Sequence, residues 1–196
     1  MKYIITIGRE YGSGGRFIAQ LLAKRLGINC YDNELLSKIA EKSGLAEGFI
    51  EQYDEKKENF FNSGINPLTT DLSLGCKVYL AQFEAIKAIA DKESCVIVGR
   101  SADYILKDYE NVLSVFIAAP FDEQVSRCVT YYNINPKKAE KTIKKMNKQR
   151  KDYYEYYTDK QWAHSESYDL CINSKIGIEA CVDILEAAIK AKFNLK

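Results

Sequence analysis

The strongest constraint on the fold lies at the N-terminus, where a β-branched run, a glycine cluster and a helical pattern follow one another. Lys2–Gly8 is rich in isoleucine and ends in glycine, which predicts a short strand. Gly12–Gly15 comes next, and the apolar residues after it recur at helical spacing as far as Leu26, where Gly27 ends the helix. Because converging backbone N–H groups and a helix N-terminus both attract anions, this order predicts a phosphate-binding loop. The alternative is a flexible turn that binds nothing.

Further strands are expected where short apolar runs lack a helical period. Cys95–Val98 and Val112–Ala119 do not alternate between apolar and polar residues, which predicts strands buried on both faces. Shorter strands are expected at Ile28–Tyr31 and Leu170–Ile172. Since helical patterns separate these runs, the chain is expected to form an α/β domain with a mostly parallel sheet.

The helical patterns lie between the expected strands and differ in length. Shorter ones cover residues 34–42, 47–60, 78–89, 121–132 and 178–189. Asn135 and Pro136 form a cap followed by a proline, which predicts the start of a long helix that reaches about Tyr157. Between Asn59 and Gly75, several Asn, Gly and Pro residues break the period, so this segment is expected to be a mobile loop.

Composition excludes several classes of protein. Of the 196 residues, 46% are hydrophobic and 28% are charged, values typical of a globular domain rather than a disordered or fibrous chain. The formal net charge of +1 provides no global attraction to nucleic acid or to a membrane, and no apolar run is long enough to span one. The 6 cysteines are scattered without CxxC spacing, which argues against a zinc site or a disulfide framework; Cys95 and Cys171 are expected in the core. A cytoplasmic location is expected.

The first of two candidate phosphate loops is the dinucleotide fingerprint. Gly12 and Gly14 match its first two glycines, and Asp32 lies at about the distance expected for a residue that binds a ribose. Phe17 occupies the third position, where close packing of the helix on the strand requires a small residue. The dinucleotide interpretation therefore fails on steric grounds.

The second candidate is the mononucleotide P-loop, G-x-x-x-x-G-K-[ST]. When Gly14 is placed at its last glycine, the lysine position falls on Gly15 and the hydroxyl position on Arg16. Arg16 retains a cation in the first helical turn and is able to bind a phosphate through two donors. It cannot coordinate Mg²⁺ as Ser or Thr would, so the magnesium ligands remain unidentified.

Two further arginines are placed where an anion would bind. Arg100 follows the strand Cys95–Val98 at the edge of the sheet where parallel α/β proteins bind ligands, although it could instead pair with Asp103 or Asp32. Arg150 lies on the apolar stripe of the long helix, and a buried guanidinium needs an anion.

Basic and aromatic residues crowd the same helix. Four lysines at helical spacing form a stripe that is expected to face solvent: Lys137, Lys141, Lys144 and Lys148. Six tyrosines lie nearby: Tyr131, Tyr132, Tyr153, Tyr154, Tyr156 and Tyr157. Basic residues mixed with aromatics also occur in proteins that bind single-stranded nucleic acid. Packing against the core or against a second copy in a homodimer explains the tyrosines better, because half of them share the buried face.

Several segments together resemble the cytidylate kinase-like family of bacterial proteins, a divergent branch of the P-loop nucleoside monophosphate kinases. The similarity is carried by Ile7–Arg16, Tyr31-Asp32, Val96–Asp103, Lys148–Tyr154 and Tyr168–Ser174. It implies a single domain with the three-layer P-loop NTPase fold, in which a mostly parallel five-stranded sheet is flanked by helices. It further implies a nucleoside-monophosphate-binding insertion at 44–75 and a lid at 133–165.

The resemblance also implies an activity and a set of site residues. The activity is phosphoryl transfer from ATP, with Mg²⁺, to a nucleoside monophosphate such as CMP. ATP would contact Gly12, Ser13, Gly14, Gly15, Arg16 and Asn173, with Asn173 near the base. The acceptor would contact Asp32, Arg100 and Asp103, and Arg16 and Arg150 would be catalytic. Because the loop lysine is absent, a nucleotide-binding sensor with little catalysis is the alternative.

Overall fold

The computed structural model describes residues 2–32 and 70–195 of the chain. The chain divides into two compact units, residues 1–30 with 93–196, and residues 31–92. The predicted helices at 34–42 and 47–60 lie outside the described residues, as does most of the predicted insertion at 44–75. The division into one domain with an insertion and a lid stays a prediction.

The fold is built on a five-stranded sheet in the order β2-β3-β1-β4-β5. The strands are β1 (Ile4–Arg9), β2 (Asn29–Tyr31), β3 (Cys95–Val98), β4 (Val112–Ala118) and β5 (Leu170–Asn173). β1 pairs in parallel with β3 and β4, and β4 pairs in parallel with β5. Helices flank the sheet, so the predicted α/β fold with a parallel five-stranded sheet is confirmed.

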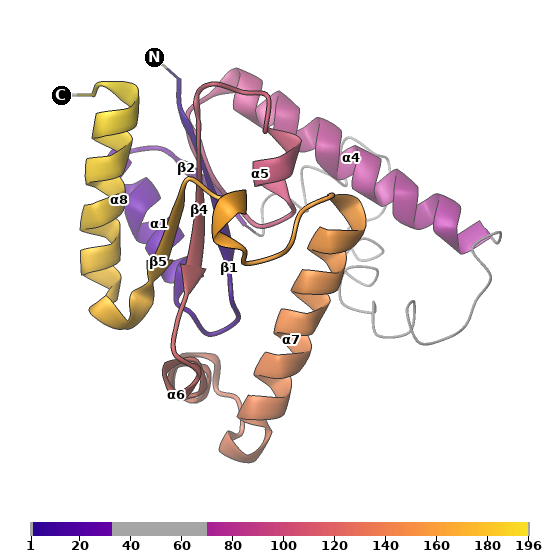
Figure 1. The fold of residues 1–196 in the computed structure, drawn as a ribbon, viewed down its shortest axis with the longest axis vertical. Helices are drawn as coiled ribbons and strands as arrows, with labels where there is room; N and C mark the ends of the chain where they lie inside the picture. Colours follow the sequence, from indigo (N-terminus) through magenta and orange to yellow (C-terminus); the bar gives the residue numbers. More distant parts are fainter. Residues whose placement is uncertain (1, 33–69, 196) are drawn as a thin grey trace. The chain divides into compact units, whose positions relative to one another are not determined.

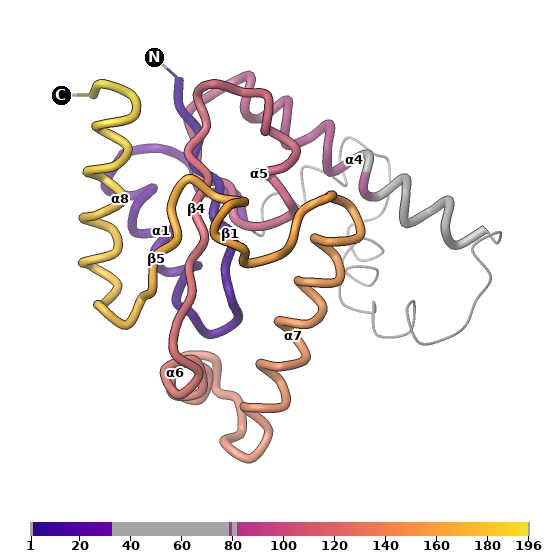
Figure 2. The backbone as a smooth tube through the Cα atoms, in the orientation of Figure 1, coloured from indigo at the N-terminus to yellow at the C-terminus, as the bar shows by residue number. Residues whose placement is uncertain are grey.

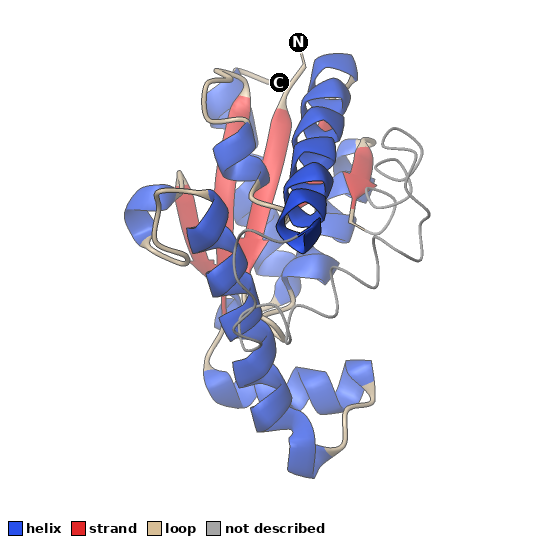
Figure 3. Cartoon of the chain, turned by 90° about the vertical axis from the view of Figure 1, so that its right-hand side faces the viewer, coloured by secondary structure: helices blue, strands red, loops and turns tan. Residues whose placement is uncertain are grey.

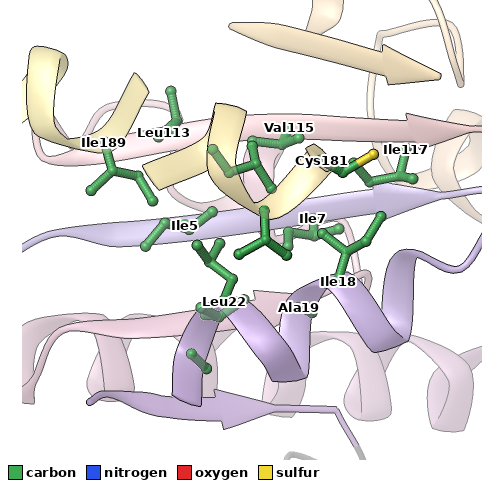
Figure 4. Packing of buried hydrophobic residues seen from close by; sticks show 14 of the residues in the cluster. Ile5, Ile7, Ile18, Ala19, Leu22, Leu113, Val115, Ile117, Cys181 and Ile189 are labelled. Carbon is green, nitrogen blue, oxygen red and sulfur yellow. The ribbon is translucent and has the colours of Figure 1, made fainter. Parts of the chain in front are cut away.

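One face of the sheet packs against two helices that carry apolar stripes. These are α1 (Gly15–Leu26) and α8 (Ile178–Phe193), and Figure 4 shows their side chains meeting those of β1 and β4. The buried cluster includes Ile5, Ile7, Ile18, Ala19, Leu22, Val115, Ile117, Cys181 and Ile189. This packing fixes α1, and therefore the N-terminus of α1, against the end of β1.

The opposite face of β4 is covered by aromatic residues. Phe116 lies between two residues of the cluster above, so its side chain points the other way. Its ring centroid lies 5.0 Å from that of Tyr168 and 5.3 Å from that of Trp162. Tyr154 of α7 (Pro136–Tyr157) continues the layer at 6.4 Å from Tyr168.

Because the strands are parallel, their carboxyl ends meet at one edge of the sheet. β4 points toward α6 (Phe121–Tyr132) in Figure 1, and the tube in Figure 2 turns sharply between α6 and α7. The short helix α5 (Ala102–Ile105) follows β3 at the same edge, and Figure 3 shows the strands running side by side toward this end. The loops that leave this edge hold the candidate site.

Several local predictions can be compared with the described residues. The long helix begins at Pro136, Asn135 accepts a hydrogen bond from the Lys137 N–H at 2.9 Å, and the helix ends at Tyr157 as predicted. The predicted loop at 59–75 is wrong in its last part, because α4 (Thr70–Lys92) is helical through Gly75. A single glycine costs a helix only about 1 kcal/mol, which a helix of 23 residues tolerates.

The two cysteines expected in the core differ in their exposure to solvent. Cys95 is fully buried in β3, as predicted, whereas Cys171 is exposed. β5 is an edge strand, so its alternate residues face away from the core and the short apolar run misled the prediction. In the described part of the chain, no helix is both long and apolar enough to span a membrane.

Candidate functional site

The glycine loop between β1 and α1 takes a conformation that requires glycine. Gly12 and Gly14 have φ of 78° and 80°, in the left-handed region where other residues are strained. A Cβ on Gly12 would lie 2.7 Å from the Gln124 carbonyl oxygen, and one on Gly14 would lie 2.6 Å from the Ile178 Cδ1. The N–H groups of Gly12 and Gly14 have no acceptor within residues 2–32 and 70–195. The loop therefore combines a fixed, tightly packed backbone with donors at the N-terminus of α1.

Two residues from outside the loop hold the Ser13 carbonyl. Arg127 of α6 donates through Nη1 to the Ser13 carbonyl at 3.0 Å and to the Ser174 Oγ at 2.9 Å, and through Nη2 to the Ser174 carbonyl at 3.1 Å. Ser174 Oγ donates to the same Ser13 carbonyl at 2.6 Å. Asn173 lies beside this contact, and its side chain accepts from the Lys175 N–H at 3.0 Å. The structure thus brings the segment predicted to bind the base next to the loop.

The Ser13 hydroxyl is engaged inside the loop. It donates to the Glu10 carbonyl at 2.8 Å and accepts from the Gly15 N–H at 3.3 Å. Its part in nucleotide binding stays a prediction.

A chain of polar contacts joins the loop to α6 and α7. The Glu10 Oε2 accepts from the Ala119 N–H at 3.0 Å and from the Gln124 Nε2 at 2.8 Å. Asn147 of α7 donates to the Gln124 Oε1 at 3.3 Å and accepts from the Tyr11 N–H at 2.6 Å. Burial raises the pKa of the Glu10 carboxyl, and the hydrogen bond from Ala119 opposes that rise. The loop and the predicted lid helix are therefore connected through partly buried hydrogen bonds.

Three arginines converge beside the loop. Arg150 donates through Nη1 to the Arg9 carbonyl at 3.0 Å, and its Cζ lies 5.3 Å from the centre of the Tyr11 ring. Burial raises the pKa of the Tyr132 hydroxyl, and the charges of Arg150, Arg16 and Arg9 oppose the rise, which places all three near Tyr132. Like charges repel one another, so a cluster of cations is typical of a site for an anion with several charges.

The turn after β3 is strained. Gly99 has φ of 75°, and the next two residues, Arg100 and Ser101, also have positive φ of 59° and 52°. Two consecutive non-glycine residues in this region cost about 1–2 kcal/mol each. Ser101 Oγ is buried and has no hydrogen-bond partner among the described residues. Strain of this kind concentrates at functional sites, and that Arg100 binds a ligand stays a prediction.

Asp103 is held by the aromatic layer. Tyr154 Oη donates to the Asp103 Oδ2 at 2.6 Å. Burial raises the pKa of the Asp103 carboxyl, and the Tyr154 hydrogen bond and the charge of Lys160 oppose that rise. Burial and the Asp103 charge in turn raise the pKa of Tyr154 well above its usual range. The structure places Asp103 where it links α5 to α7, and its predicted contact with the acceptor stays a prediction.

Asp32 and the magnesium ligands are the last parts of the predicted site. Asp32 follows β2 and belongs to the second unit, and its contact with the acceptor stays a prediction. Among residues 2–32 and 70–195, no three His, Cys, Asp or Glu side chains are placed to hold a metal ion.

Arg9, Arg127 and Asn147 contribute to the site but were missed from the sequence. Arg9 directly follows the buried part of β1, so its position at the ligand edge of the sheet was the available signal. Arg127 and Asn147 contact loop residues 114 and 136 positions away, and no local pattern reveals such contacts.

Comparisons with known proteins agree with this arrangement. The model of the cytidylate kinase-like family matches residues 4–176. The chain belongs to this family. A search of curated proteins found no match.

Several solved structures share the fold of this chain. An uncharacterized protein from Eubacterium ventriosum is 30% identical, with a TM-score of 0.72 over 96% of this chain and 99% of that one. Shikimate kinase from Bacteroides thetaiotaomicron is 13% identical, with a TM-score of 0.59 over 96% and 98%. A sugar kinase from Janibacter is 12% identical, with a TM-score of 0.56 over 100% and 96%. The fold is that of the P-loop kinases.

Proposed function

We propose that this protein transfers the γ-phosphoryl group of ATP to a nucleoside monophosphate, with CMP as the leading acceptor. The observation that carries the proposal is the approach of Arg150 to the glycine loop, where it contacts the Arg9 carbonyl and the Tyr11 ring. A cation on a separate helix, directed at the phosphate loop, is what phosphoryl transfer requires. The family membership supports the kinase chemistry, and the name of the family supports the pyrimidine acceptor.

The residues divide into a donor side and an acceptor side. On the donor side, the N–H groups of Gly12 and Gly14 and the Arg16 guanidinium would bind the ATP phosphates, with Ser13, Gly15 and Asn173 as further contacts of the nucleotide. On the acceptor side, Arg100 would bind the monophosphate, with Asp32 and Asp103 as further contacts. The two sides correspond to the ends of β1 and β3, which are paired neighbours in the sheet.

In the reaction, an acceptor phosphate oxygen forms a bond to the γ-phosphorus while the bond to the β–γ bridging oxygen breaks, which leaves ADP. Negative charge shifts onto the bridging oxygen and the equatorial oxygens, and Arg150 and Arg16 would stabilise it. Mg²⁺ supplies further charge neutralisation when it is bound with ATP. In kinases this ion is usually held by substrate phosphates and waters together with one or two carboxylates.

A binding module with little catalysis is the second candidate. Gly15 at the lysine position and Arg16 at the hydroxyl position favour it, because both residues that usually bind the β- and γ-phosphates and Mg²⁺ are replaced. Such a module would bind ATP as a sensor and turn over no acceptor.

A coupled assay of ADP release with CMP, dCMP, UMP and AMP, beside calorimetric titration with MgATP, separates the two. The proposed kinase shows acceptor-dependent turnover, and Arg150→Ala lowers kcat by about 10²–10³-fold while ATP affinity changes only a few-fold. Lys148→Ala, which removes a charge from the exposed side of the same helix, serves as the control. Tight ATP binding without turnover on any acceptor would favour the sensor, and equal losses of binding and turnover would remove Arg150 from the catalytic role.

A further inference from the structure

We propose that Arg9 replaces the missing lysine of the P-loop, so that the phosphate-binding cation of this loop comes from its first position rather than its seventh. The inference rests on the proposed function. In the motif G-x-x-x-x-G-K-[ST], the last glycine is Gly14, which places Arg9 at the first glycine and Gly15 at the lysine. The cation and the glycine have therefore exchanged positions.

The structure shows that the two positions compete for the same space. A Cβ on Gly15 would lie 2.7 Å from the Cβ of Arg9 and 3.2 Å from its Cγ. The first carbons of a lysine at position 15 would have to occupy the volume that the Arg9 side chain fills. Glycine at position 15 is thus the residue that makes room for Arg9.

The Arg9 side chain runs from the donor side to the acceptor side. A Cβ on Gly99 would overlap the Arg9 guanidinium, so this group lies against the Gly99 backbone at the start of the turn that carries Arg100. The same residue contributes the carbonyl that Arg150 contacts at 3.0 Å. Arg9 therefore extends from the glycine loop to the turn after β3, across the region where the transferred phosphoryl group would pass.

The other arginines near the loop serve this position less well. Arg127 uses both of its terminal nitrogens on Ser13 and Ser174. Arg16 is exposed in the first turn of α1. Arg150 reaches the loop from α7, so its distance from the phosphates depends on that helix. Arg9, in contrast, is the last residue of β1, the middle strand of the sheet, so the strand that carries it is paired on both sides.

The test changes Arg9 and Gly15 singly and then together, so that the last variant has the glycine and the lysine of the ordinary P-loop motif. Arg9→Met keeps most of the side-chain volume and removes the charge, Arg9→Lys keeps a charge, and Gly15→Lys adds the usual lysine to a loop that already holds Arg9. The double variant Arg9→Gly/Gly15→Lys restores the ordinary motif. Lys24→Ala, on an exposed position of α1, is the control for the loss of one positive charge. Each variant is assayed for turnover, for MgATP affinity by calorimetry and for its melting temperature.

We expect Arg9→Met to lower kcat/KM by about 10²-fold or more with a small change in melting temperature, and Arg9→Lys to recover part of this loss. Gly15→Lys should also lose activity, because its side chain collides with Arg9. The double variant should exceed both Arg9→Met and Gly15→Lys by at least about tenfold, because its lysine supplies the cation without colliding with Arg9 and positions in contact couple.

The outcomes separate the inference from the proposed function. If the unmodified protein neither binds MgATP nor turns over any acceptor, both fall. If the unmodified protein is active and the Arg9→Met variant has the same turnover, the inference alone is overturned. The same holds if Arg9→Met lowers the melting temperature but not the turnover, because Arg9 is then a structural residue. A double variant no better than the singles would also overturn it, because the two positions would then not share one function. If Arg9→Met does not fold, the comparison of Arg9→Lys, Gly15→Lys and the double variant decides.

Discussion

The loop after β1 and the turn after β3 leave the same edge of the sheet but achieve their conformations in different ways. In the loop, positive φ falls only on Gly12 and Gly14, and hydrogen bonds from α6, α7 and the segment after β5 hold the backbone. In the turn, positive φ extends over Gly99 to two side-chain-bearing residues, Arg100 and Ser101. The turn is joined to β1 through the Gly99 N–H, which donates to the Ile7 carbonyl at 3.0 Å, and within itself the Ala102 N–H donates to the Gly99 carbonyl at 3.2 Å.

This difference separates two ways of building a binding site. The loop is made of residues that suit its geometry, so its stability and its function agree. The turn carries positive φ at Arg100, the residue proposed to bind the acceptor, so under that proposal stability and function should oppose each other there. Four experiments test this contrast.

The largest effect is expected for Gly12→Ala, which breaks the loop. The added Cβ would meet the Gln124 carbonyl at 2.7 Å and would also take an unfavourable φ. We expect a loss of about 3 kcal/mol in the free energy of unfolding, measured with urea, together with loss of MgATP binding. Gly27→Ala is the matched control, since Gly27 has φ of 65° but no atom within 4 Å of an added Cβ. It should cost only about 1 kcal/mol and leave binding intact. Equal losses in the two variants would show that packing of the loop on α6 is unimportant.

A smaller loss is expected when the anchor of the loop is removed. Arg127→Met leaves the Ser13 and Ser174 carbonyls without a charged donor, which should lower the free energy of unfolding by about 2 kcal/mol. Glu123→Gln removes only the ion pair of Arg127 with the partly exposed Glu123, 3.4 Å away, and should cost well under about 1 kcal/mol. Thermal melts monitored by circular dichroism measure both. If Glu123→Gln were as damaging as Arg127→Met, the ion pair rather than the contacts to the loop would support the site.

The turn should respond in the opposite direction. Arg100→Gly relieves the positive φ, so we expect the protein to become more stable by about 0.5 kcal/mol while kcat/KM for the acceptor falls. Ala163→Gly relieves a similar φ of 61° at an exposed position and should stabilise the protein without changing activity. A fall in stability for Arg100→Gly alone would mean that the Arg100 side chain contributes more to folding than its strain costs.

The smallest effect concerns pH and the residue that ties α5 to α7. Burial raises the pKa of Asp103, so the folded state binds this proton more tightly than the unfolded chain does. The resulting stabilisation is present below the unfolded pKa of about 3.9 and is lost as the pH rises through the folded pKa. Asp103→Asn removes this titration. Its stability relative to the unmodified protein should therefore improve as the pH rises through that range. Urea unfolding from pH 3.5 to pH 7 measures the difference; a difference independent of pH would contradict it.

Much of the fold could be predicted because its signals are local. The Asn135-Pro136 cap, the αL Gly27 at the end of α1 and the apolar run of β3 each act within a few residues. Exposure of Cys171 could not be predicted, since it depends on β5 being at the edge of the sheet. The start of α4 was missed because glycine and threonine have low helix propensity that a long helix overrides.

The position of the candidate site could be predicted, but the side-chain contacts that hold its residues in place could not. The glycine loop and Arg100 follow strands, so the parallel sheet brings them to one edge, and Arg150 was indicated by its place on an apolar stripe. That Arg9 fills the space beside Gly15 depends on side-chain directions that a sequence motif does not describe. Asp103 was assigned to the acceptor from its place beside Arg100, whereas its partner Tyr154 lies 51 positions away.

The hydrogen bond from the Tyr11 N–H to the Asn147 Oδ1 joins the glycine loop directly to α7. A movement of α7 that took Asn147 away from the loop would leave the Tyr11 N–H without its acceptor. It would also break the hydrogen bond from Asn147 to Gln124, which in turn contacts Glu10. Leaving these groups without partners would cost about 1–3 kcal/mol, which a movement of α7 away from the loop would have to overcome. Under the proposed function, a nucleotide that needs α7 to move would enter and leave at the expense of this one amide contact.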